Sequence, residues 1–269
     1  MTIEAGRKLA LVTGASAGIG VAFARQLAAD GHDVILVARR LERLEALAAE
    51  LSAKHGVAAI PLRIDLSLPD AREKVAAALE KLGRKVDVLV NNAGFSTATT
   101  YAATPWERES AMIMTLMHAV ASLTHLVLPD MLARGQGRII NVASVVGFAP
   151  GVAGHTLYPA AKSFVIKFTQ SLDCEVRAKG IKVTALCPGF TETEFQDVAG
   201  MSELAQKSRL TRGDDPALVV AQGLSGNLAG KVIVVTGMRN KLSRFAMKVL
   251  PEGLTRPLIN YGARKFRKE

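Results

Sequence analysis

Cysteine and histidine are scarce in this chain. Its 269 residues include only 2 cysteines, Cys174 and Cys187, and 5 histidines. The cysteines form no CxxC pair, so we expect reduced thiols in packing roles rather than a disulfide or a metal site. The histidines show no HxxxH or HxH spacing. The sequence therefore predicts no metal centre.

Long apolar runs and a leader segment are also missing. No uninterrupted apolar run reaches the roughly 18 residues of a membrane span. The first residues lead almost directly into an apolar stretch at Leu9, without the h-region and cleavage site of a signal peptide. We therefore expect a cytoplasmic protein. The share of hydrophobic residues is 49% and that of charged residues 22%, as in an ordinary globular protein.

Acidic residues are depleted at one end of the chain. The formal net charge is +10, and nine basic residues against Glu252 and Glu269 give residues 238–269 +7 of this total. Apolar residues recur in the same segment at helical spacing, at Leu242, Phe245, Ala246 and Val249. A basic amphipathic helix suits peripheral contact with the inner membrane surface, packing on a partner subunit or docking on its own domain, and these alternatives remain open. No aromatic and basic strand pattern points to nucleic acid.

Short apolar runs alternate with longer amphipathic ones along most of the chain, which predicts an α/β fold with a doubly wound parallel sheet of about seven strands and helices on both faces. The predicted strands are Leu9–Thr13, Val34–Ala38, Ala58–Ile64, Val86–Val90, Arg138–Ala143, Lys182–Leu186 and Lys231–Val235. The predicted helices are Gly18–Asp30, Leu41–His55, Pro69–Leu82, Pro105–Leu132, Thr156–Lys179 and Pro216–Asn227. Without a repeat or a low-complexity linker, we expect one domain, 1–237, followed by the extension 238–269.

A glycine-rich turn follows the first predicted strand and opens a helix. Its sequence is TGASAGIG, from Thr13 to Gly20. A helix N-terminus offers free N–H groups to a pyrophosphate. Gly14 permits the tight turn, Gly18 and Gly20 a close approach, and Ser16 adds a hydroxyl donor. We interpret the turn, Ile19 included, as a dinucleotide site; a purely structural turn is the alternative.

The end of the second predicted strand indicates which dinucleotide is bound. An acidic residue there would hydrogen-bond the ribose 2′-hydroxyl of NAD, whereas an arginine can hold the 2′-phosphate of NADP. This chain has Ala38, Arg39 and Arg40, and no carboxylate before Glu42. Arg39 therefore favours NADP(H) over NAD(H). The alternative is that both arginines begin the next helix in solvent.

Polar residues close the third and fourth predicted strands. Asp65 and Leu66 end the third, and the run Asn91–Gly94 ends the fourth. Carboxyl ends of strands line the ligand crevice of an open α/β sheet. The polar residues among them could contact the adenine or brace a neighbouring strand, and a role in an Asx turn is the alternative.

Ser144, Tyr158 and Lys162 provide a candidate acid–base group. Tyr158 and Lys162 are four residues apart on a predicted helix, which places them on one face. A nearby cation favours the phenolate, so we expect Lys162 to lower the pKa of Tyr158. Ser144, at the end of a strand, could hydrogen-bond a substrate oxygen. The alternative is an ordinary solvated helix.

Taken together, these motifs resemble the short-chain dehydrogenase/reductase superfamily. They are TGASAGIG at 13–20, NNAG at 91–94, Ser144, YPAAK at 158–162 and CPGFTET at 187–193, in the order of the family. The resemblance implies a Rossmann-type fold, a homodimer or homotetramer, and NAD(P)-dependent interconversion of an alcohol and a carbonyl compound. It implies that Tyr158 exchanges the proton, Lys162 also binds the nicotinamide ribose, and Ser144 holds the substrate oxygen. Further cofactor contacts are implied for Asp65 and Leu66 at the adenine, Asn91, Ala93 and Gly94 along the cofactor, and Pro188, Gly189, Thr191 and Thr193 at the nicotinamide.

The chain departs from the family pattern in two places. Leu116 stands where many members have a helix asparagine of the proton relay, and Thr115 and His118 are nearby polar candidates. Ser144 and Tyr158 are one residue further apart than is commonest. An NADP-binding regulator or scaffold with degenerate catalysis is therefore the alternative function.

Apolar residues close to these motifs predict a pocket for a hydrophobic carbonyl compound. Ordinary core packing is the alternative. The residues are Phe95, Phe148, Val152, Phe190, Phe195, Val198, Met201 and Leu204.

Overall fold

The computed structural model describes residues 6–97, 99–191, 194 and 213–263. These residues form a seven-stranded sheet in the order β3-β2-β1-β4-β5-β6-β7. All neighbouring strands run parallel. The strands are β1 (Leu9–Thr13), β2 (Asp33–Ala38), β3 (Ala59–Arg63), β4 (Val88–Asn91), β5 (Gly137–Val142), β6 (Ile181–Cys187) and β7 (Ile233–Val235). The predicted doubly wound parallel sheet is confirmed.

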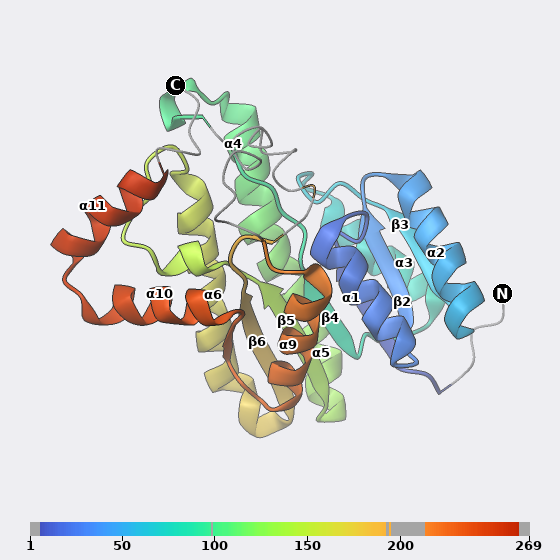
Figure 1. Ribbon diagram of the computed structural model, residues 1–269. Coiled ribbons are helices and arrows are strands. Elements are labelled where there is room, and N and C mark those ends of the chain that lie inside the picture. The colour runs from blue at the N-terminus through green and yellow to red at the C-terminus, as the bar shows by residue number, and fades with distance from the viewer. Residues whose placement is uncertain (1–5, 98, 192–193, 195–212, 264–269) are drawn as a thin grey trace.

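Helices cover both faces of the sheet (Figure 1). Alternate side chains of a strand point to opposite faces, so a fully buried strand must be apolar throughout. The strand side chains on one face of the sheet pack on α1 (Gly18–Ala29), α2 (Leu41–His55) and α9 (Pro216–Leu228). Those on the other face pack on α3 (Ala71–Leu82), α5 (Ala119–Arg134) and α6 (Leu157–Val176). In β1, for example, Ala10 and Val12 belong to the first core and Leu9 and Leu11 to the second.

The long helix predicted before β5 is interrupted. It consists of α4 (Trp106–Ile113), a five-residue π-helical turn (Met114–His118) and α5. By length and composition, the 29-residue stretch Trp106–Arg134 could cross a membrane. In the fold, however, the α5 residues Leu123 and Val127 are buried in the core beneath the sheet.

Two helices follow the last strand. α10 (Met238–Val249) and α11 (Glu252–Ala263) are separated at Leu250 and Pro251, so the predicted tail helix continues as a second helix. Both project away from the sheet (Figure 1). α10 contacts the 3₁₀ turn Val145–Phe148, which follows β5. The extension therefore touches the segment that leads from Ser144 toward Tyr158.

Candidate active site

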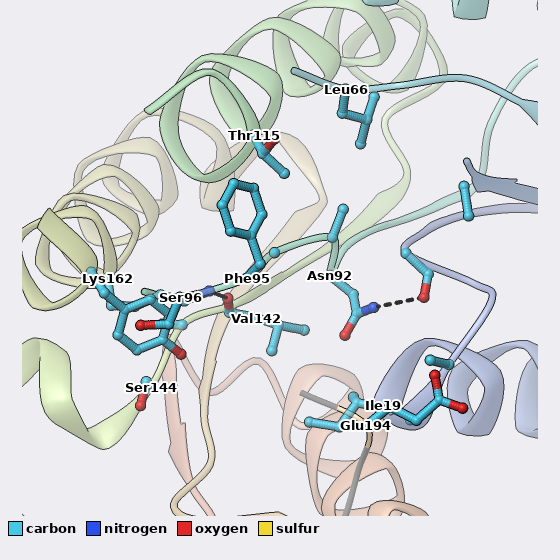
Figure 2. A pocket seen from close by; sticks show the side chains of 18 of the residues that line it. Ile19, Leu66, Asn92, Phe95, Ser96, Thr115, Val142, Ser144, Lys162 and Glu194 are labelled. Carbon is cyan, nitrogen blue, oxygen red and sulfur yellow. Dashed lines mark hydrogen bonds between the residues drawn. The ribbon is translucent and has the colours of Figure 1, made fainter. Parts of the chain in front are cut away.

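A cavity of about 820 Å³ opens at the carboxyl ends of the parallel strands. It brings together the glycine turn after β1, the arginines after β2 and the predicted acid–base group. Figure 2 shows Ser144, Lys162, Phe95, Ser96 and Thr115 toward one end, and Ile19 and Glu194 toward the other. The predicted residues that line it are Gly14, Ser16, Gly18, Ile19, Arg39, Asp65, Leu66, Ala93, Gly94, Ser144, Tyr158, Lys162, Pro188, Gly189 and Thr191. Thr193 lies outside the described residues.

The glycine turn approaches the end of β4 very closely. Gly14 has φ +67°, and a Cβ there would lie 2.8 Å from Cα of Ala93. Asn92 fixes this approach, because its Nδ2 donates to the carbonyl oxygen of Thr13 at 2.9 Å. The same Nδ2 donates to the carbonyl oxygen of Gly14 at 3.4 Å (Figure 2). Gly14 therefore combines a left-handed backbone with a contact that excludes a side chain.

Gly20 differs from the prediction. It does not line the cavity, and it is buried on the inner side of α1. A Cβ at this position would lie 2.2 Å from the carbonyl oxygen of Gly14 and 2.7 Å from Nδ2 of Asn92. Gly20 is thus required for packing the helix against the turn, and its predicted part in the approach of a phosphate stays a prediction.

The two arginines after β2 take different positions. Arg39 is exposed and lines the cavity, and its role as a phosphate ligand stays a prediction. Arg40 instead lies against the glycine turn, where its guanidinium donates to the hydroxyl and the carbonyl oxygen of Ser16 at 3.1–3.2 Å. It also pairs with Glu194 at 2.9 Å. The sequence assigned no ligand role to Arg40 and did not indicate Glu194, yet both line the cavity.

Asn91 also differs from the prediction. Its side chain is buried among the helices and strands, and Asn91 is not among the described residues that line the cavity. Its Nδ2 donates to Asn141 Oδ1 at 2.9 Å and to Thr124 Oγ1 at 3.1 Å. Asn141 in turn donates to Thr169. Asn91 therefore links β4 to β5 and α5, while its neighbours Ala93 and Gly94 line the cavity.

Asp65 lines the cavity and also forms a turn. Its Oδ1 accepts from the N–H of Ser67 at 3.0 Å and from the Ser67 hydroxyl at 2.7 Å. The functional and the turn-forming interpretations of this residue are thus compatible. The turn holds the carboxylate at the cavity wall.

Ser144 and Tyr158 lie within hydrogen-bond reach of each other, and this bond favours a lower pKa of Tyr158. The extra residue between them is therefore accommodated. The Ser144 oxygen also accepts from the N–H of Val146 at 3.3 Å, which caps the following 3₁₀ turn. The serine hydroxyl is thus held by backbone and phenol together.

The expected lowering of the pKa of Tyr158 is wrong for this structure. Burial raises that pKa to about 12 and outweighs the hydrogen bond from Ser144. Lys162 lies with its Nζ 5.6 Å from the centre of the tyrosine ring and does not contribute to the shift. Its own pKa is lowered to about 8 by burial. The phenol is therefore the stable form at neutral pH.

The position of the expected helix asparagine is apolar. Leu116 is fully buried in the π-helical turn and packs in a cluster with Met112 and Ala161. A Cβ on Gly94 would lie 2.6 Å from Cδ2 of Leu116. Of the two polar candidates nearby, Thr115 lines the cavity, whereas His118 is exposed on the outside.

The predicted apolar pocket is partly present. Phe95, Val152 and Phe190 line the cavity. Phe148 does not; its ring lies 4.8 Å from the guanidinium carbon of Arg244 in α10. The predicted lining residues Phe195, Val198, Met201 and Leu204 lie outside the described residues.

Polar residues that the sequence did not indicate also line the cavity. They include Ser96, Glu107, Arg108 and His155. Ser96 Oγ and His155 Nδ1 lie 3.5 Å apart, and burial lowers the pKa of His155. Within the described ranges, no group of three or more His, Cys, Asp or Glu side chains could hold a metal ion.

Comparison with known proteins identifies the family and supports the fold. A family model described as "short chain dehydrogenase" matches residues 8–203. Serine 3-dehydrogenase from Agrobacterium fabrum is 37% identical over 77% of this chain and 81% of its own length. A short-chain dehydrogenase from Sphingobium yanoikuyae in complex with NADPH superimposes with a TM-score of 0.81, at 32% identity over 94% of each chain. A 7beta-hydroxysteroid dehydrogenase gives a TM-score of 0.84, at 30% identity over 94% of this chain and 96% of its own.

The chain belongs to the short-chain dehydrogenase family. It is an NAD(P)-dependent oxidoreductase with a Rossmann-type fold.

Proposed function

We propose that the protein is an NADP(H)-dependent enzyme that interconverts an alcohol and a ketone or aldehyde, with Tyr158 as acid–base. The observation that carries this proposal is the shared cavity: Ser144, Tyr158 and Lys162 line the same space as the glycine turn and Arg39. A dinucleotide and a carbonyl compound can therefore be held together. The bound nicotinamide would supply or accept the hydride.

The residues at the glycine turn fit a dinucleotide. Gly14 and Gly18 have φ +67° and +51°, a backbone conformation that favours glycine. Because glycine has no side chain, the backbone at the start of α1 stays open to a ligand. The N-terminus of that helix faces the cavity and suits an anionic phosphate. Arg39 and Arg40 add positive charge after β2, which favours the 2′-phosphate of NADP(H).

Tyr158 suits reduction of a carbonyl. A phenol with a pKa raised to about 12 remains protonated at neutral pH and can donate its proton to the substrate oxygen. Ser144, hydrogen-bonded to the phenol, can donate to the same oxygen. Lys162 holds positive charge near the ring and, with its pKa of about 8, is largely protonated at neutral pH. Because Lys162 does not lower the pKa of Tyr158 in this structure, we assign it the binding of the nicotinamide ribose, as the family resemblance implies.

The substrate end of the cavity favours a hydrophobic carbonyl compound. The rings of Phe95 and Phe190, together with Val152, supply apolar walls. The guanidinium carbon of Arg108 lies 5.5 Å from the centre of the Phe95 ring, so one wall carries a cation. We therefore expect an apolar body with a polar group at one end.

The extension 238–269 supports peripheral contact with an anionic membrane surface. Met238, Leu242, Phe245 and Val249 are 54–77% exposed, and their spacing places them on one face of α10. Leu254 and Tyr261 on α11 are 60% and 72% exposed. Basic residues flank this apolar stripe, a pattern that fits a helix lying in the interface of anionic lipids.

Charge argues against a second copy as the occupant of this surface. A symmetric dimer places the same patch on both partners. In the described part of the extension, 238–263, five basic residues stand against Glu252, so two positively charged surfaces would then face one another. We propose that the protein forms a homodimer or homotetramer through its long helices, as the family resemblance implies. We also propose that it lies in the cytoplasm, with peripheral contact at the inner membrane surface.

Replacing Tyr158 with phenylalanine tests the catalytic assignment. Tyr158→Phe removes only the hydroxyl, so turnover should fall by roughly 10²–10⁴-fold. NADPH binding, measured by fluorescence titration, should be retained. Turnover that survives would contradict the mechanism.

Over a panel of hydrophobic ketones, the wild-type protein should consume NADPH only with substrate, whereas the scaffold alternative predicts NADPH binding without NADPH consumption.

A further inference from the structure

An acidic side chain from a distant part of the chain occupies the positive end of the cavity. Glu194, between β6 and α9, pairs with Arg40 at 2.9 Å and with Arg43 at 2.6 Å. Arg40 is anchored at the same time on Ser16 of the glycine turn. Ser16, Arg40 and Glu194 all line the cavity.

Both arginines hold Glu194 as an anion. Their hydrogen bonds lower the pKa of the Glu194 carboxyl, with Arg43 as the larger cause. The carboxylate thus carries a full negative charge at neutral pH. It lies in the positive region that the end of β2 offers to a phosphate.

We infer that Glu194 sets the preference of this site between NADPH and NADH. This inference rests on the proposed dinucleotide site. The Glu194 carboxylate forms ion pairs with Arg40 and Arg43. A 2′-phosphate that binds these arginines must displace it. When the ribose carries a 2′-hydroxyl instead, the carboxylate stays and accepts a hydrogen bond from it.

Charge and exposure make this exchange feasible. The side chains of Arg40, Arg43 and Glu194 are 40–48% exposed, so their ion pairs are weak and easily replaced. A phosphate monoester carries about −1.5 to −2 charge and would repel the carboxylate while attracting both guanidiniums. For NADH, an acidic residue near the ribose is the usual partner of the 2′-hydroxyl. The end of β2 lacks one, and Glu194 supplies it from another element.

The experiment compares nucleotide binding by Glu194→Gln and the wild-type protein. Glutamine keeps the size of the side chain and removes its charge. NADPH affinity should rise roughly threefold to tenfold, because two arginines are released. NADH affinity should stay equal or fall. The fragments 2′-AMP and 5′-AMP isolate the effect, since only 2′-AMP should bind more tightly to the variant.

Glu50→Gln is the matched control. Glu50 makes the same kind of pair, with Arg25 at 2.8 Å, and does not line the cavity. It changes the net charge equally, so an effect of overall charge would appear in both variants. An unchanged ratio of NADPH to NADH affinity in Glu194→Gln, or an equal change in Glu50→Gln, would overturn the inference. Failure of the wild-type protein to bind either nucleotide would instead overturn the proposed function.

Discussion

Nζ of Lys162 donates a hydrogen bond of 2.7 Å to the carbonyl oxygen of Val142, the last residue of β5 (Figure 2). The lysine is thus held by the sheet as well as by its helix. The side chain is also buried, with only 5% of Lys162 exposed. A buried cation with one hydrogen bond is costly, which is why its pKa is lowered.

The buried lysine predicts a pH-dependent stability. The pKa of Lys162 is about 8 in the folded protein, against 10.5 for an unperturbed lysine. Between these values the unfolded chain binds a proton that the folded protein has lost, so the free energy of unfolding rises with pH. Below about pH 8 the penalty is complete, at about 3 kcal/mol, and above 10.5 it is absent. Urea unfolding of Lys162→Met and wild type from pH 7 to 10.5 should show the relative advantage of the variant shrinking.

The difference between the two proteins is the quantity to compare, because it cancels the titration of surface groups that both share. A difference in unfolding free energy that stays constant over this pH range would show that Lys162 is not buried as a cation.

Gly20→Ala should destabilise the protein and weaken nucleotide binding. The new Cβ would lie 2.2 Å from a backbone oxygen of the glycine turn, which cannot rotate away as a side chain could. We expect a loss of about 1–3 kcal/mol in unfolding free energy. Gly253→Ala in α11 is the control, since its Cβ would meet nothing within 4 Å. Thermal unfolding and NADPH titration of both variants check this; equal stability of the two would contradict the packing role of Gly20.

The sheet could be predicted because its signals are local. Alternating apolar runs and amphipathic stretches repeat along the chain, and parallel strands bring their carboxyl ends to one edge. It could therefore be predicted from the sequence alone that Gly14, Tyr158 and Lys162 line one cavity. The separation of 238–269 as an extension outside the domain stays a prediction.

Other features depend on partners that are remote in sequence. Asn91 turns inward because Asn141, 50 residues later, accepts its hydrogen bond. Arg40 meets Glu194 across 154 residues. The raised pKa of Tyr158 reflects burial by the folded protein, which outweighs the hydrogen bond from Ser144. No local pattern encodes these contacts.

Arg39→Ala should weaken NADPH far more than NADH. A guanidinium that bonds a phosphate is worth about 1.5–3 kcal/mol, which corresponds to roughly a tenfold to hundredfold rise in the Kd for NADPH. NADH has no 2′-phosphate, so its Kd should change little. Arg25→Ala, which removes an arginine of α1 outside the cavity, controls for net charge. Equal losses for both nucleotides would contradict the preference for NADP(H).

The apolar stripe of α10 predicts binding to anionic vesicles. The wild-type protein should sediment with phosphatidylglycerol vesicles more strongly than with phosphatidylcholine vesicles, and added salt should weaken the binding. Replacing Leu242 and Phe245 with serine removes two side chains that are 68% and 61% exposed. The partition constant should fall roughly tenfold to hundredfold, because each side chain would bury apolar area in the lipid.

Leu218 and Leu228 on α9 provide the matched control. They are 60% and 55% exposed, but they lie outside the basic extension. Their replacement with serine should leave vesicle binding unchanged if the stripe, and not exposed leucine in general, contacts the lipid. A wild-type protein that ignores both kinds of vesicle would contradict the membrane proposal. If the α10 variant instead loses mass in sedimentation velocity, the stripe is an interface between copies of this chain.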